Sequence, residues 1–312
     1  MLDNPSYGTT IYRPSDSLAL PDTMNFPVGL EPIYHNGKEL PKKDGQFVVN
    51  RRTNEPISIV GGQYVAHDYN HFWEPLIEGI EMSGIDLSKA TVKFTNIRHG
   101  AAMKAVITIP NEDVSNIMGE AMALGIGVLN SLDGSLKYEV SVYNIRLACL
   151  NGLWRMAEST SAKFKHTVGT DPERIATVAS TWPLELRQDT HAFKHMREVF
   201  IHPSIAEDFL SRKLCVTRTK RETKVNKKWL NRMLALNDTY RATMGDNAWA
   251  LYNAITHYGT HVDTDSGRCT TDVGQRALQQ ERNVTALVQG PAFTNLVQYD
   301  VFERQYSSSL AA

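Results

Sequence analysis

A tight turn inside an alternating stretch of sequence constrains the fold of this chain more than any other feature. Asp133-Gly134 supplies the positive φ that a short hairpin turn requires, and Asn130 and Ser131 precede it with side chains that can hydrogen-bond the turn backbone. The next residues, 137–143, alternate polar side chains with bulky or β-branched ones, which is the pattern of a half-buried strand. The sequence therefore predicts an antiparallel hairpin at this point.

The residues after this strand lead into the fold. We expect an element that carries Arg146 and Cys149 inward and ends in a left-handed cap or turn at Asn151-Gly152.

The chain has three cysteines, Cys149, Cys215 and Cys269. They are far apart and odd in number, so they predict neither a disulfide framework nor a zinc knuckle. The first residues are polar and turn-forming where a signal peptide would be basic and apolar, and no apolar run approaches the ~18 residues of a membrane span. Together with the unpaired cysteines, these features indicate a cytoplasmic protein with no membrane partner.

Strand patterns fill the N-terminal half of the chain. The expected elements are a hairpin at 46–64, a helix at about 67–84, strands at 92–97 and 103–109 joined through Arg98-His99-Gly100, and a short helix at 111–124. In the first of these helices, Phe72, Leu76 and Ile80 have the spacing of a single apolar face. That face predicts packing of the helix on the neighbouring strands.

Helical spacing with few strand formers takes over beyond residue 185, at 189–212, 222–243 and 246–258. The predicted fold class is therefore α+β, with N-terminal antiparallel β-hairpins and packed helices followed by a C-terminal helical region. The expected parts are an extended N-terminal arm at 1–44, a β-rich α+β core at 45–185, a basic helical region at 186–262, and a C-terminal segment with a flexible tail at 263–312.

The charge of the chain is concentrated in one stretch within the helical region. The net charge is only −1, but residues 212–232 hold nine basic side chains against one acid, Glu222, so the rest of the chain sums to about −9. The nine basic residues are Arg212, Lys213, Arg218, Lys220, Arg221, Lys224, Lys227, Lys228 and Arg232. A net charge near zero would by itself argue against a negatively charged partner. The concentration of positive charge in one stretch is the stronger indication, and it favours such a partner.

Single-stranded DNA is the partner that this stretch predicts. The cations can hold phosphates, while Trp229 and Tyr240 offer flat faces for bases, and such stacking is indifferent to sequence. The other interpretation is a solvated helix face with Trp229 buried as a core residue. A solubilising helix normally mixes acids with bases, and the near absence of acids here favours binding. Arg146 is a further candidate contact in the hairpin region.

Metal-binding and catalytic patterns are weaker. Three histidine pairs have i,i+4 spacing, and they are His67 and His71, His191 and His195, and His257 and His261. None has the glutamate of a His-Glu-x-x-His zinc protease, so we expect neither a metal site nor a cofactor. The chain also lacks the Gly-x-Ser-x-Gly elbow, a phosphate-binding loop and a dinucleotide fingerprint, and we expect no enzymatic activity.

Three blocks of sequence resemble a phage- and plasmid-borne family called domain of unknown function 932. The blocks are the hairpin run 130–154 with its Arg146 and Cys149-x-Asn151, an opening hairpin at 47–64, and a Trp-x-x-x-Asn-Ala-x-Thr helix at 247–261. Leu132 stands where the family often has histidine. The resemblance implies a phage origin and a role in replication, recombination or transcription of an invading genome. Two kinds of protein offer an analogy: single-strand annealing proteins, and single-stranded-DNA-binding cofactors of a phage RNA polymerase.

The expected function is thus sequence-independent binding of single-stranded DNA by a non-enzymatic protein in the host cytoplasm. The further partners expected are the phage RNA polymerase or replication proteins, and other copies of the chain in a homo-oligomer. Two alternatives stay open: a non-catalytic virion or host-interaction protein, whose basic stretch would meet an acidic protein, and a metal-dependent nuclease.

Overall fold

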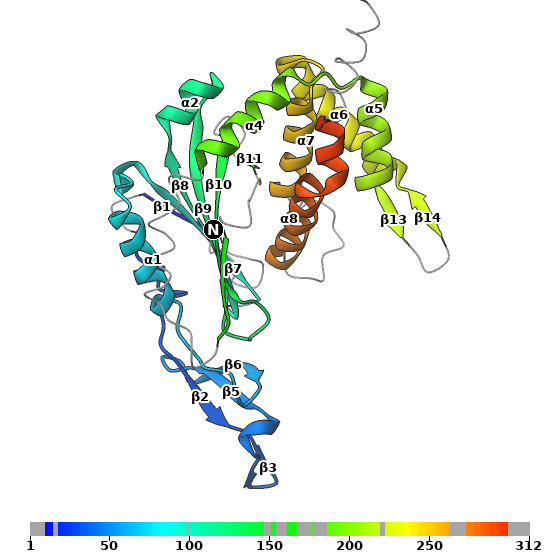
Figure 1. Cartoon of the computed structure of the whole chain (residues 1–312). Helices are drawn as coiled ribbons and strands as arrows, with labels where there is room; N and C mark the ends of the chain where they lie inside the picture. Colours follow the sequence, from blue (N-terminus) through cyan, green and yellow to red (C-terminus); the bar gives the residue numbers. More distant parts are fainter. Residues whose placement is uncertain are drawn as a thin grey trace, which may run out of the picture.

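A seven-stranded antiparallel sheet lies between one long helix and the C-terminal helices (Figure 1). The structure is a computed structural model, and it describes residues 10–14, 18–98, 100–146, 151–153, 161–166, 176, 186–218, 222–261 and 273–298. Antiparallel strands in the N-terminal half and helices in the C-terminal half confirm the α+β prediction.

Consecutive hairpins form the centre of the sheet. They join β7 (Thr91–Ile97), β8 (Ala102–Pro110), β9 (Met122–Ser131) and β10 (Tyr138–Arg146). At one edge β1 (Thr10–Pro14) pairs with β7, and at the other both β11 (Asn151–Leu153) and β12 (Ser161–Phe164) pair with β10. The predicted turn between β9 and β10 is confirmed, because Gly134 has φ of 70°, a conformation that costs glycine little.

Helix α1 (Asn70–Met82) covers one face of the sheet. Phe72, Leu76 and Ile80 are each 0% exposed, which confirms the predicted apolar face. They pack with alternate residues of the central strands, such as Phe94 and Ile126, in a single core. Burying each of these large side chains stabilises the fold by roughly 1.5–3 kcal/mol, so α1 is held firmly on the sheet.

The opposite face of the sheet has a narrow strip of glycine on β9. A Cβ atom on Gly125 would lie 2.6 Å from the ring of Tyr143, and one on Gly127 would lie 3.0 Å from it. The two glycines therefore make room for the Tyr143 ring, which is 2% exposed. Burial, with the nearby Glu281 carboxylate as a smaller cause, raises the pKa of the Tyr143 hydroxyl well above its usual value.

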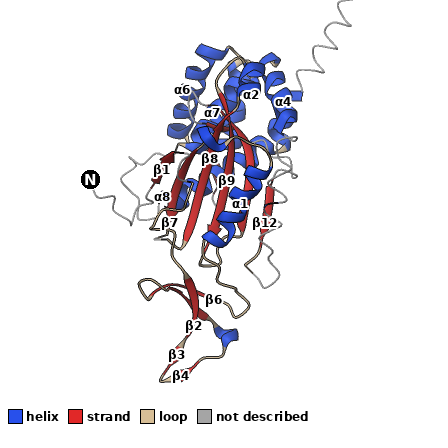
Figure 2. Ribbon diagram, turned by 90° about the vertical axis from the view of Figure 1, so that its left-hand side faces the viewer, coloured by secondary structure: helices blue, strands red, loops and turns tan. Residues whose placement is uncertain are grey.

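A small arm extends from the end of the main sheet (Figure 2). Its three-stranded sheet joins β2 (Val28–Pro32), β5 (Gln46–Asn50) and β6 (Glu55–Val60), and its tip is the hairpin of β3 (Tyr34–His35) and β4 (Lys38–Glu39). Short helices lie at η3 (Lys42–Asp44) and η4 (Leu87–Lys89). The predicted hairpin at 46–64 is confirmed. In the described part of residues 1–44, β1 pairs with the main sheet and β2 pairs with β5 in the arm.

The C-terminal helices pack around α7 (Ala248–Thr260), which is buried along most of its length. The other elements of this region are α4 (Leu186–Glu198), α5 (Pro203–Phe209), η7 (Leu210–Leu214), β13 (Val216–Arg218), β14 (Thr223–Val225), α6 (Lys227–Met244) and α8 (Val273–Gln289). The C-terminal segment predicted at 263–312 is described only in part. Helix α8 belongs to the helical core, and residues 263–272 and the expected tail beyond 298 lie outside the described residues.

Three predicted boundaries are wrong. The helix expected at 111–124 is only α2 (Glu112–Met118), which ends at Gly119 with φ of 65°, and β9 begins at Met122. The helix expected at 189–212 is divided, because Pro203 begins a new helix at a position where its missing N–H costs nothing. Asn151-Gly152 lies in strand β11 instead of a cap.

In the described part of the chain, no helix is long and apolar enough to span a membrane.

Candidate nucleic-acid interface

The basic stretch includes a β-hairpin that sequence reasoning missed. Strands β13 and β14 pair antiparallel, with Thr217 opposite Lys224, between η7 and the first turn of α6. The hairpin projects from the helical region in Figure 1. Its base is fixed to the core at Cys215, which is buried and accepts a hydrogen bond from the Asn226 N–H at 2.8 Å. Three-residue strands are too short to give a clear alternating pattern, so sequence reasoning assigned no element to β13 and placed β14 in a helix over 222–243.

The described basic side chains of this stretch all lie at the surface. They are Arg212, Lys213, Lys224, Lys227, Lys228 and Arg232. Arg218 is described only by its backbone, and Lys220 and Arg221, in the turn between the two strands, lie outside the described residues. We call η7, the β13–β14 hairpin and the first turn of α6 the basic surface.

Two of these cations already have acidic partners. Arg212 pairs with Asp208 at 2.7 Å and Lys224 pairs with Glu222 at 2.6 Å. Both pairs are largely exposed, so each contributes about 0–1 kcal/mol and can exchange its carboxylate for a phosphate. Among the described residues, Lys213, Lys227 and Lys228 make no ion pair.

The first turn of α6 places positive charge at the positive end of a helix. Asn226 caps the helix, because its side chain accepts a hydrogen bond from the Trp229 N–H at 3.1 Å. Lys227 and Lys228 follow directly, and the first turn contains no acid. Helix dipoles favour acids here by about 0.3–1 kcal/mol, so these lysines oppose helix stability but favour an anion bound beside them.

Neither candidate stacking residue is free on this surface. Tyr240 is 7% exposed, and its hydroxyl is hydrogen-bonded to His257 Nδ1 at 2.9 Å. Trp229 is half-buried, with its ring 5.4 Å from that of Tyr258, and its buried indole N–H finds no partner among the described residues. Most of the Trp229 ring therefore packs in the core, as the alternative interpretation expected. Tyr240 contributes no stacking face.

Arg146 lies in an ion-pair cluster away from the basic surface. Its guanidinium pairs with Glu120, which also pairs with Arg197 of α4. The side chains of Arg146 and Glu120 are each 15% exposed. Arg146 therefore connects the end of β10 to the helical region instead of offering a surface contact.

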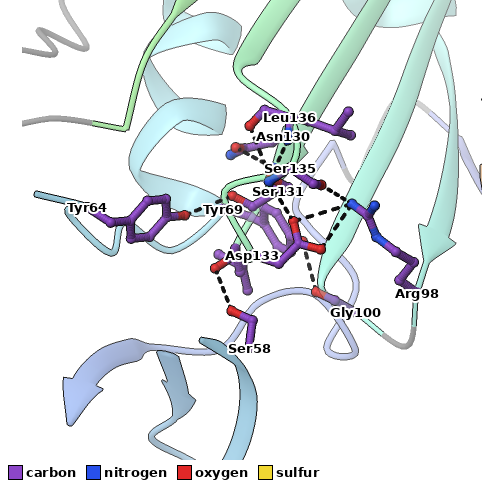
Figure 3. A network of polar contacts seen from close by, with 11 residues as sticks. Ser58, Tyr64, Tyr69, Arg98, Gly100, Asn130, Ser131, Asp133, Ser135 and Leu136 are labelled. Atoms are coloured by element: carbon purple, nitrogen blue, oxygen red, sulfur yellow. Dashed lines mark hydrogen bonds and ion pairs between the residues drawn. The ribbon is translucent and has the colours of Figure 1, made fainter. Parts of the chain in front are cut away.

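A second polar network surrounds the turn between β9 and β10 (Figure 3). Asp133 accepts a hydrogen bond from the Ser135 N–H at 2.9 Å and pairs with Arg98 at 3.1 Å. Arg98 also donates to the Ser135 hydroxyl, and it has φ of 52°, which non-glycine residues rarely adopt. Because Arg98 lies between β7 and β8, this pairing ties two neighbouring hairpin ends together.

The same turn anchors the arm, and the neighbouring turn between β7 and β8 anchors the start of α1. Tyr64 Oη donates to the Ser131 carbonyl at 3.1 Å, and Ser58 Oγ of β6 donates to the Leu132 carbonyl at 3.2 Å. Tyr69, just before α1, donates to the Gly100 carbonyl at 2.8 Å. Leu132 itself is fully buried in the core. These contacts assign the turn a structural role, which the sequence indicated only for Asp133-Gly134 itself.

Two of the three histidine pairs are stacked rings. His67 and His71 lie 4.1 Å apart, as do His257 and His261. Burial, then His261 and Arg232, lower the pKa of His257 to about 4, and burial with His71 lowers that of His67. The side chain of His191 lies outside the described residues. No group of three or more histidine, cysteine or acidic residues could hold a metal ion in the part of the chain that is described.

Comparison with known families gives the lineage of the chain. The domain of unknown function (DUF932) matches residues 56–287, which is well over half of the sequence. The chain belongs to the DUF932 family. No curated protein and no solved structure matches it. The DUF932 match begins within β6 and ends within α8, so it includes the network at Asp133 and the whole basic surface, while β1 to β5 lie outside it.

Proposed function

We propose that the chain is a non-enzymatic protein that binds single-stranded DNA without regard to sequence, through the phosphates. The supporting observation is the first turn of α6, where Lys227 and Lys228 lie exposed at the positive end of an 18-residue helix, in a turn that contains no acid. A phosphate bound there would remove an unfavourable arrangement and form charge-assisted hydrogen bonds. The exposed cations of η7 and β14 would extend the contact along a strand.

The shape of the surface favours a flexible strand over a duplex. The cations lie on a short path from η7 over a narrow hairpin to α6. Single-stranded DNA can bend along this path, whereas duplex DNA has a persistence length of about 50 nm and would touch only its outermost point. Base stacking contributes little in this proposal, since Tyr240 is buried and Trp229 offers only the exposed part of its ring.

The process served would be replication, recombination or phage-directed transcription of a phage or plasmid genome. This follows the origin that the resemblance to the family implies, and the partners would be the replication proteins or RNA polymerase of that genome.

Fluorescence anisotropy with labelled oligo-dT and a duplex of equal length tests the proposal. We expect tighter binding to oligo-dT, with log K falling linearly against log salt concentration. The double variant Lys227→Ala/Lys228→Ala should weaken binding and reduce the slope by about 1.4, at roughly 0.7 per phosphate contact on single strands. Lys42→Ala/Lys43→Ala on η3 is the matched control, because it removes two adjacent exposed lysines from the arm.

Equal loss of slope in both double variants would show that binding is not centred on α6. Failure of the wild-type chain to bind oligo-dT at micromolar concentration and low salt would refute the proposal. Retention of an acidic protein after nuclease treatment would then favour the host-interaction alternative.

A further inference from the structure

A groove runs along the outer side of α1, far from the basic surface. It consists of a hollow of about 810 Å³ and a second of about 490 Å³, which share Asn25, Asn70, His71 and Glu74 as lining residues. One wall is α1 and the other is the segment that leads into β2. Its apolar lining includes Leu18 and Ile77, which are partly exposed, above the buried Leu20 and Trp73. The lining follows α1 from Asn70 to Glu81, so the groove runs along most of the helix.

The charge of the groove has one sign. Asp68, Glu74, Glu78 and Glu81 line it, and its described lining includes no lysine or arginine. Glu78 and Glu81 are exposed, and neither makes an ion pair among the described residues. An occupant that combines cations with apolar side chains would therefore complement both the acidic rim and the apolar lining.

The β13–β14 hairpin has this combination. Val225 is a large apolar residue that remains 45% exposed, and its cross-strand partner is Val216. Lys224 is exposed beside Val225, and its pair with Glu222 is exposed enough to exchange for another carboxylate. Lys220 and Arg221 lie between the two strands in the sequence. The ends of the chain lack this charge, since residues 1–17 and 299–312 each contain one arginine against two acids. Residues 212–232 are the densest basic stretch in the sequence.

The hairpin and the groove lie on opposite sides of the molecule. In Figure 1 helix α1 is at one side of the sheet and β13–β14 is at the far side of the helical region, and α1 faces the viewer in Figure 2. A hairpin therefore cannot reach the groove of its own chain. It can reach that of a second copy.

We propose that the β13–β14 hairpin of one copy docks into the α1 groove of another, with Val225 on the apolar lining and Lys224 beside Glu78 and Glu81. Because the two surfaces differ, the contact is head-to-tail, so repetition produces a ring or a filament. This contact goes beyond the proposed DNA binding. It occupies the hairpin, including Lys224 of the basic surface, and leaves Lys227 and Lys228 at its base available for phosphates.

Sedimentation velocity over a range of protein and salt concentrations tests the contact. We expect concentration-dependent association that weakens with salt. The groove variant Glu78→Lys/Glu81→Lys and the hairpin variant Lys224→Ser/Val225→Ser should each be monomeric. Mixed together, they should form a dimer and nothing larger, because only one intact hairpin and one intact groove then remain to pair.

Glu39→Lys/Asp44→Lys on the arm changes net charge as much as the groove variant does, and should associate like the wild type. The changed residues are all exposed, so circular dichroism should show unaltered folding. The groove variant should also bind a short oligo-dT at least as tightly as the wild type, because its basic surface is intact and undocked, and this separates the contact from DNA binding. A wild-type monomer throughout the micromolar range, or a variant mixture that does not dimerise, would overturn the proposal.

Discussion

At the residue scale, Asp133 has two roles, of which the sequence reveals one. Its position before glycine predicts the turn, and the hydrogen bond to the Ser135 N–H confirms that local geometry. The ion pair with Arg98 comes from a different hairpin, 35 residues earlier in the chain. That pairing depends on the two hairpin ends lying side by side, and no local pattern encodes it.

The Asp133 pair gives the first stability prediction. Both side chains are less than one third exposed, so Asp133→Asn should lower the free energy of unfolding by about 1–3 kcal/mol through loss of a partly buried charge-assisted contact. Urea denaturation measures the change. Asp44→Asn on the exposed arm is the control and should change stability by less than about 0.5 kcal/mol. Equal effects would show that the network contributes nothing specific.

The glycine strip on β9 gives a second prediction. Gly125→Ala places a methyl group 2.6 Å from the buried Tyr143 ring, so the ring or the strand must move, at a cost of about 1–3 kcal/mol. Gly61→Ala is the matched control, since a Cβ there meets nothing within 4 Å. Thermal unfolding followed by circular dichroism compares the two variants, and an unchanged melting temperature for Gly125→Ala would contradict the role assigned to the strip.

At the scale of elements, sequence patterns located long strands and helices but not short or interrupted ones. The apolar face of α1 was predictable because three turns repeat the same spacing, and all three of its predicted residues are buried. The β13–β14 hairpin was not, because each strand has three residues and charged side chains mask the alternation. Sequence reasoning therefore placed Lys224 in a helix, whereas it lies in strand β14.

The stacked histidine pair at the end of α7 makes stability depend on pH. The pKa of His257 is lowered to about 4 in the folded chain, while an unfolded histidine titrates near 6.5, so the unfolded state binds the proton more readily. Stability should therefore be complete above about pH 6.5 and decrease as the pH falls toward 4. In urea titrations across this range, His257→Gln should show a shallower decrease than the wild type. Parallel curves would exclude His257 as a source of the dependence.

At the scale of the whole molecule, two buried ion-pair groups join the sheet to the helical region. Lys104 of β8 pairs with Glu281 of α8, 177 residues later, and Glu120 connects Arg146 of β10 with Arg197 of α4. The sequence could not predict these contacts, because each cation looks like an ordinary surface charge until the helices are placed against the sheet. This is why Arg146 was a candidate for DNA contact and is instead part of the joint.

Glu120 provides the test of this joint. In Glu120→Gln the guanidiniums of Arg146 and Arg197, which are 15% and 35% exposed, lose their shared carboxylate, so stability should fall by about 1.5–3 kcal/mol, the range for hydrogen bonds to charged groups. Below the unfolding transition, the affinity for oligo-dT and its salt slope should stay at wild-type values, because the basic surface is untouched. Arg146→Ala should behave in the same way in anisotropy titrations. A reduced salt slope in Arg146→Ala would instead show that this residue contacts phosphate, and would extend the DNA-binding surface from the hairpin to the edge of the sheet.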